Sequence, residues 1–216
     1  MKKIVAILFS LALFCSASGQ KVYGKTVPVT WTDSLAGDYS FVDKWSYGEN
    51  VFTNNFFQLV CDVECPPEIR KMEDSRGRIY DSLIHEYYKL LDTTHHFHTM
   101  QCEGWCYEFG GMDFIEVLRR SKTGIYLESP INDGTHSSLR LAIENNVCTP
   151  TIKLTSEVSD PDGKYIFYYH CTGGYIKIDK AYWQRGIMKA EFDFTFFHPE
   201  HPKLKMYWKG KIYCKM

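Results

Sequence analysis

The strongest constraint on the fold is the alternation of apolar and polar side chains within residues 187–197, which is strict over residues 188–196. Successive side chains of an extended strand point to opposite faces, so one face of this strand is apolar and the other is polar. A second alternating run follows at residues 204–213, after a segment that contains Pro199 and Pro202. The pattern predicts an antiparallel hairpin with one buried face. The predicted buried positions of its first strand are Met188, Ala190, Phe192, Phe194 and Phe196.

Most of the remaining chain also has the pattern of β-strands. Alternating or β-branched runs predict strands at residues 22–31, 56–60, 138–144, 151–155, 164–171 and 175–179. Gly173 and Gly174 fall between the last two runs and predict a hairpin turn. Residues 80–91 differ, because their apolar side chains recur at the spacing of an amphipathic helix, and Pro66 and Pro67 predict a short helical turn before it.

These patterns together predict a mainly β fold. We expect an antiparallel sandwich or barrel with one helical insertion at residues 66–92. The alternative is an α+β domain in which the helix packs on one face of the sheet.

Residues 1–19 have the features of a secretory signal peptide. Two lysines precede an apolar run at residues 4–14, and Ala17 and Gly19 supply the small side chains of a cleavage site. The apolar run is shorter than the roughly 20 residues that span a bilayer, so we expect cleavage and no transmembrane anchor. We therefore expect an exported protein, periplasmic or extracellular, whose residues 20–216 form a single β-rich domain.

The composition narrows the range of partners. The formal net charge is −1, and no dense run of basic residues is present, so we expect no nucleic-acid partner. The chain has 14 Phe, 15 Tyr and 5 Trp, which suit both a β-rich core and a binding surface. We expect ligand-binding residues at Trp45, Tyr47 and Trp105, which lie in loop-like aromatic segments. The candidate ligands are a glycan, a lipid-like molecule or a protein.

The cysteines are candidates for disulfide bonds. Exported proteins fold where disulfides persist, and seven of the eight cysteines follow the predicted signal peptide. An odd number leaves at least one thiol outside intramolecular pairing. We expect bridges that tie the helical insertion to the β-rich body. The seven candidates are Cys61, Cys65, Cys102, Cys106, Cys148, Cys171 and Cys214.

Residues 95–110 contain a possible metal site. On a strand, His96 and His98 project to the same face, where two imidazoles can share a metal ion. The spacing His96-x-His98-x4-Glu103-x6-Gly110 resembles the first metal-binding motif of the cupins, which are β-barrels. This resemblance implies a small metal-dependent enzyme that binds one divalent metal ion through His96, His98 and Glu103. The chain departs from the cupin pattern at Leu90, where the motif has a glycine.

Other catalytic patterns are incomplete. Glu191 and Asp193 are spaced as in the Glu-x-Asp-x-x-Glu strand of jelly-roll glycosidases, but Phe196 stands where the general acid should be. The Gly-x-Ser-x-Gly motif of many serine hydrolases does not occur. We therefore favour a non-catalytic binding or surface module without a cofactor. The metal-dependent enzyme is the alternative.

The C-terminal strands resemble those of uncharacterised exported proteins of Gram-negative bacteria, many with lipocalin-like or sandwich folds. The matching segments are residues 174–179, 186–194 and 208–213. The resemblance implies an exported β-rich fold and assigns no catalytic residue.

Overall fold

The computed structural model describes residues 24–48, 51–61, 67–106, 108–131, 136–155, 166–198 and 201–216. The predicted signal peptide lies outside these residues. None of the helices in the described ranges has the length and hydropathy that crossing a membrane requires.

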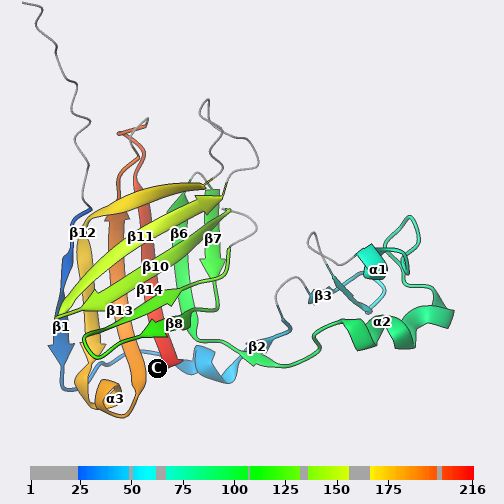
Figure 1. Cartoon of the computed structure of the whole chain (residues 1–216), viewed down its shortest axis with the longest axis horizontal. Coiled ribbons are helices and arrows are strands. Elements are labelled where there is room, and N and C mark those ends of the chain that lie inside the picture. The colour runs from blue at the N-terminus through cyan, green and yellow to red at the C-terminus, as the bar shows by residue number, and fades with distance from the viewer. Residues whose placement is uncertain are drawn as a thin grey trace, which may run out of the picture.

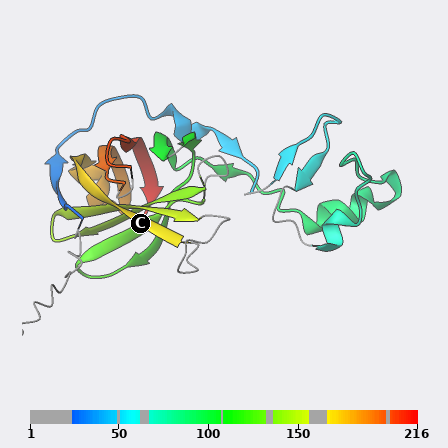
Figure 2. The ribbon, with the colours of Figure 1, turned by 90° about the horizontal axis from the view of Figure 1, so that it is seen from above.

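The fold is mainly β, as predicted, and its main element is a ten-stranded sheet that curls into a half-barrel (Figures 1 and 2). All neighbouring strands are antiparallel except β1 and β12, which run parallel, so the sheet is mixed. In order across the sheet the strands are β7 (Glu108–Met112), β6 (Met100–Cys106), β14 (Met206–Lys215), β13 (Ile187–Phe196), β12 (Ile166–Asp179), β1 (Val27–Thr32), β11 (Val147–Thr155), β10 (Ser137–Glu144), β9 (Gly124–Glu128) and β8 (Glu116–Arg120).

The curled sheet encloses one apolar core. Strands β8 to β11 lie across the half of the sheet that contains β6, β13 and β14 (Figure 1), and both halves contribute buried side chains. The predicted hairpin is confirmed as β13 paired with β14, in a register that joins Phe194 to Trp208. Phe194 is fully buried, and its ring stacks on that of Phe192 at a centroid distance of 5.2 Å. All five predicted core positions of β13 are buried.

The interpretation of Gly173 and Gly174 as a hairpin turn is wrong. Strand β12 continues through both glycines, pairing with β11 before them and with β13 after them. The register shifts between Cys171 and Gly173, and Gly174 has a φ of +127°. A Cβ atom at Gly174 would collide with the backbone oxygen of Asp193, so both the conformation and the close approach require glycine. The glycines therefore form a β-bulge inside one long strand.

The predicted helical insertion lies to one side of the half-barrel (Figures 1 and 2). The insertion begins earlier than the predicted residue 66, with β3 (Val51–Thr53) and β4 (Leu59–Cys61), and continues with α1 (Pro67–Arg70), η2 (Asp81–Leu83) and α2 (Ile84–Leu90). A two-stranded ladder of β2 (Trp45–Ser46) and β5 (His96–Phe97) joins the chain segments that enter and leave it. The remaining short elements are η1 (Ser40–Asp43) and α3 (Lys180–Gln184).

The insertion has a small core of its own. Its buried side chains form a cluster separate from the core of the sheet, so α2 packs within the insertion. Tyr87 is completely buried there, and its hydroxyl donates to Glu73 Oε1 at 2.8 Å and accepts from the Cys61 N–H at 3.1 Å. Burial, together with the hydrogen bond to Glu73, raises the pKa of Tyr87, so the hydroxyl keeps its proton. The cluster consists of Val60, Ile69, Ile79, Tyr87 and Leu91.

The structure corrects the disulfide prediction. Cys61 is disulfide-bonded, whereas Cys102, Cys106, Cys148, Cys171 and Cys214 are free thiols. The last four are buried and pack in the core of the sheet as small apolar side chains. The described residues therefore do not show the expected bridges from the insertion to the sheet, and Cys65 lies outside them.

Strand geometry excludes a disulfide bond between Cys102 and Cys106. Cys102 and Cys106 both lie on β6, four positions apart, which separates their Cα atoms by about 13 Å in an extended strand. A disulfide requires a Cα separation below about 7 Å. Burial raises the pKa of Cys102, Cys106 and Cys214 to about 12, so these thiols are protonated and unreactive at neutral pH.

The Phe194→Ala substitution tests the core. It should lower the free energy of unfolding by about 3–5 kcal/mol, because it removes a fully buried ring from between the two halves of the sheet. The matched control is Phe57→Ala, at a side chain that is 92% exposed, which should change stability by less than about 0.5 kcal/mol. Urea denaturation followed by tryptophan fluorescence measures both. Equal effects of the two variants would contradict the placement of Phe194.

The Tyr87→Phe substitution tests whether the insertion has its own core. It removes the donor to Glu73 and leaves the Cys61 N–H without its acceptor, at a cost of about 1–3 kcal/mol. Hydrogen–deuterium exchange should speed up across residues 67–91 and stay unchanged in β10, β13 and β14. Tyr88→Phe, at the adjacent helical position, serves as the control. Faster exchange throughout the sheet would show that the two cores are not independent.

The thiol reagent dithionitrobenzoate tests the cysteines. The five thiols should react slowly in the native protein, because burial raises the pKa of each and keeps it protonated, and should all react in denaturant. Absorbance of the released thionitrobenzoate counts them in both states. If fewer than five react after denaturation without reductant, some of these cysteines are bridged.

Candidate functional site

The predicted metal site is not present in the structure. Each predicted ligand has a separate partner: Asp92 for His96, Ser46 for His98 and Lys209 for Glu103. The structure, as far as it describes the chain, contains no group of three His, Cys, Asp or Glu side chains placed to hold a metal ion. The physical reason is that β5 ends at Phe97 and a new strand, β6, begins at Met100. Glu103 therefore lies on β6 in the ten-stranded sheet, whereas both histidines lie at the β2–β5 ladder.

The structure divides the predicted aromatic ligand surface into two groups. Trp45 stacks on His95 at a centroid distance of 3.7 Å, and Tyr47 packs edge-on against Trp45 at 5.4 Å. These rings lie at the β2–β5 ladder. Trp105 instead lies on β6, where its register partners are Tyr207 of β14 and Phe109 of β7.

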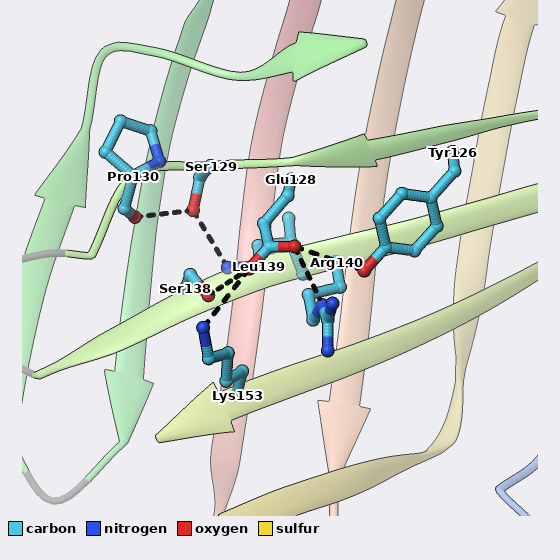
Figure 3. A network of polar contacts seen from close by, with 8 residues as sticks. All are labelled: Tyr126, Glu128, Ser129, Pro130, Ser138, Leu139, Arg140 and Lys153. Carbon is cyan, nitrogen blue, oxygen red and sulfur yellow. Dashed lines mark hydrogen bonds and ion pairs between the residues drawn. The ribbon is translucent and has the colours of Figure 1, made fainter. Parts of the chain in front are cut away.

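A polar network connects β9, β10 and β11 (Figure 3). Glu128 is its centre: it lies 3.0 Å from Arg140 Nε and 3.8 Å from Lys153 Nζ, and it accepts from Tyr126 and Ser138. The guanidinium of Arg140 also lies 5.3 Å from the centre of the Tyr126 ring. Because the charged groups are paired with one another across neighbouring strands, we interpret this network as a structural tie between strands.

A groove of about 630 Å³ lies on the outward face of the other half of the sheet, across β6, β7, β12, β13 and β14. Two rows of side chains run across this face in the register of the strands, and negative and positive groups alternate along each row. The first row consists of Tyr175, Asp193, Lys209, Glu103 and Gly111. The second row consists of Lys177, Glu191, Lys211 and Gln101.

Several charged groups of the groove are paired. Glu103 Oε1 lies 2.7 Å from Lys209 Nζ, and Glu191 Oε1 lies 3.5 Å from Lys177 Nζ. The Tyr175 hydroxyl donates to Glu191 at 2.7 Å, and this hydrogen bond, with burial, raises the pKa of Tyr175 to about 12. Tyr175 therefore remains a neutral hydrogen-bonding group over the physiological pH range.

Asp193 differs from the other carboxylates of the groove. It is half-buried, and no described residue forms an ion pair with it within 4.0 Å. Phe109, 59% exposed, contributes an apolar surface to the groove, and Gly111 leaves the position opposite Glu103 without a side chain. The groove thus combines an accessible carboxylate with aromatic surface.

The sequence indicated part of this site. Alternation along β13 placed Glu191 and Asp193 on the polar face, and the structure confirms that both face away from the core. It did not indicate that Phe109, Tyr175 and Lys209 lie beside these carboxylates, because the neighbours of a strand are set by the order of strands in the sheet. The pairing of β6 with β14 joins segments about a hundred residues apart, and no local pattern reports it.

Comparisons with protein-family models, with curated proteins and with solved structures found no match to this chain. The class of the protein is therefore defined by its own structure: a mainly β, curled-sheet protein with a charged and aromatic surface groove.

Proposed function

We propose that this chain is an exported binding protein that holds a neutral glycan in the groove across β6, β7, β12, β13 and β14. Export is supported by the signal-peptide features of residues 1–19. Binding is supported above all by Asp193, a half-buried carboxylate without an ion-pair partner among the described residues, in a groove that also contains exposed aromatic rings.

The chemistry of the groove matches that of a sugar. Carboxylates accept strong hydrogen bonds from hydroxyl groups, and lysines donate them, so Asp193 and Lys209 can orient a polar ring. The aromatic faces of Phe109 and Tyr175 offer apolar surface for the C–H groups of the same ring. Ligand sites typically combine such apolar surface with a few placed polar groups, and the volume of about 630 Å³ lies in the usual range.

The balance of charge favours a neutral ligand. The two rows contain three carboxylates and three lysines, and the charged groups alternate in sign along each row. An acidic or a basic polymer would meet repulsive groups at every second position. The residues of the two rows that carry charge are Glu103, Glu191, Asp193, Lys177, Lys209 and Lys211.

The arrangement also favours binding over glycoside cleavage. Cleavage requires one carboxyl group that donates a proton and a second that acts as base or nucleophile. Glu103 and Glu191 are each held by a lysine, and Phe196, at the position of the glycosidase general acid, is buried in the core. The carboxylates are thus placed to accept hydrogen bonds.

Glycan binding can be tested with a panel of neutral oligosaccharides, including cello-, xylo-, manno- and chito-oligosaccharides. Isothermal titration calorimetry should detect binding of at least one of them to the mature protein. Tyr175→Ala and Asp193→Asn should each weaken that binding about tenfold, equivalent to about 1.4 kcal/mol. Thin-layer chromatography of the same mixtures should show no cleavage.

Tyr80→Ala is the matched control for Tyr175→Ala. Tyr80 is 50% exposed and lies in the insertion, so its removal should leave the oligosaccharide affinity unchanged. The proposal is wrong if no oligosaccharide of the panel binds, or if binding survives the combined Tyr175→Ala/Asp193→Asn variant with a normal melting temperature.

A further inference from the structure

We infer that Ser46, His98 and Asp113 form a nucleophile–base–acid triad that hydrolyses esters, and that the apolar pocket beside His98 holds the acyl group. This activity goes beyond glycan binding and uses none of the residues of the groove. The three residues are brought together by the fold, since the sequence contains no serine-hydrolase motif around Ser46.

The three side chains contact one another in the order serine, histidine, aspartate, which is the order that activates a serine nucleophile. Ser46 Oγ lies 2.7 Å from His98 Nε2, and His98 Nδ1 lies 3.6 Å from Asp113 Oδ1. The carboxylate beside Nδ1 favours a proton on that nitrogen, which leaves Nε2 free to accept the Ser46 proton. The second distance is that of an ion pair rather than of a hydrogen bond, and such catalytic contacts commonly shorten when substrate binds.

Backbone hydrogen bonds fix each member of the triad. The N–H of His98 donates to the oxygen of Lys44 at 3.0 Å, which continues the β2–β5 ladder and sets His98 diagonally across from Ser46. The carbonyl oxygen of Asp113 accepts from the N–H groups of Thr99 and Met100 at 2.9 Å and 3.0 Å. The ring of Phe114 packs edge-on against His98 at 5.2 Å and limits its rotation. Ser46 and His98 are therefore held at the β2–β5 ladder, and Asp113, which follows the end of β7, is held by its backbone hydrogen bonds to Thr99 and Met100.

An apolar pocket of about 730 Å³ begins at His98. Its walls come from η1, the β2–β5 ladder, β8 and the end of β14, and most of them are apolar. The volume lies within the range of pockets that enclose small organic ligands. His98 is only 9% exposed and Ser46 is half-buried, so the base and the nucleophile are partly shielded from water, while the Asp113 side chain is exposed. The apolar lining includes Val42, Phe97, Ile115, Val117 and Met216.

Another buried histidine of the described residues shows the contrast with a purely structural role. His198 is 2% exposed, stacks on Tyr169 at 5.0 Å and accepts the N–H of His201 at its Nδ1. Nδ1 of His198 thus accepts a backbone N–H, and its Nε2 lies 3.4 Å from the hydroxyl of Tyr169. His98 instead directs Nε2 to a serine hydroxyl and Nδ1 to a carboxylate, at the mouth of a pocket.

The reaction proceeds in two steps without a further reagent except water. Ser46 Oγ bonds to the acyl carbon of the ester as His98 Nε2 takes its proton; the ester C–O bond then breaks and His98 returns the proton to the leaving alcohol. Water next attacks the acyl-Ser46 carbon, with its proton passing to His98. The bond to Ser46 breaks, the carboxylic acid leaves, and Ser46 recovers its proton.

Covalent labelling with an alkyl fluorophosphonate tests the nucleophile independently of the natural substrate. Ser46 should displace fluoride and form a stable phosphonate ester, which peptide mass spectrometry locates. Ser46→Ala should abolish labelling, while Ser82→Ala, at an exposed serine of η2, should leave it unchanged. The inference is overturned if the wild-type protein is not labelled at Ser46.

Hydrolysis of p-nitrophenyl butyrate tests the base and the pocket. His98→Gln and Asp113→Asn should each lower the rate, with a loss of about 10²-fold or more for His98→Gln. Val117→Trp should fill the pocket and shift the preference from the butyrate to the acetate ester. Circular dichroism and melting curves identify variants that fail to fold. Ser46→Ala is a small change at a half-buried side chain, so we expect this variant to fold and to report on the nucleophile alone. Unchanged hydrolysis by folded Ser46→Ala overturns the inference.

Discussion

The rest of the structure depends on the burial of a single apolar face of a continuous hydrogen-bonded sheet. Such a face is stable only when it is covered, and no helix in the described residues is large enough to cover ten strands. The sheet therefore curls until its two halves cover each other. The bulge in β12 makes this possible, because one strand then pairs with β11 in the first half and with β13 in the second. The outward face of the same curled sheet is left polar, and both the groove and the network around Glu128 lie on it.

The features that the sequence predicted are those set by local periodicity. Alternation predicted β13 with its buried phenylalanines, and the helical spacing over residues 80–91 predicted α2 within the insertion. The errors concern long-range partners. Gly173 and Gly174 have the composition of a turn, and only their contact with β13 makes them a bulge. The cysteines suggested bridges, but their strands place them apart and bury them as thiols.

The sequence predicted the candidate sites less completely than it predicted the fold. The sequence pattern predicted His98 as a metal ligand, because His96 stands two positions before it and Glu103 follows. Its actual partners, Ser46 and Asp113, are 52 and 15 residues away along the chain. They meet only because the β2–β5 ladder and the segment between β7 and β8 bring them to one place. Sites assembled from distant segments leave no local spacing for a motif search to detect.

The position of β1 has a consequence for how the chain reaches its folded state. This first strand lies between β11 and β12, whose residues follow it by more than a hundred positions. During synthesis β1 cannot pair until β11 and β12 have been made, when most of the chain is complete. Contacts between segments so far apart in the sequence also form slowly. A chain that passes through an export channel from its N-terminus would thus emerge with β1 unpaired and extended. The topology itself delays closure of the half-barrel until β11 and β12 are available, when most of the chain has been synthesised.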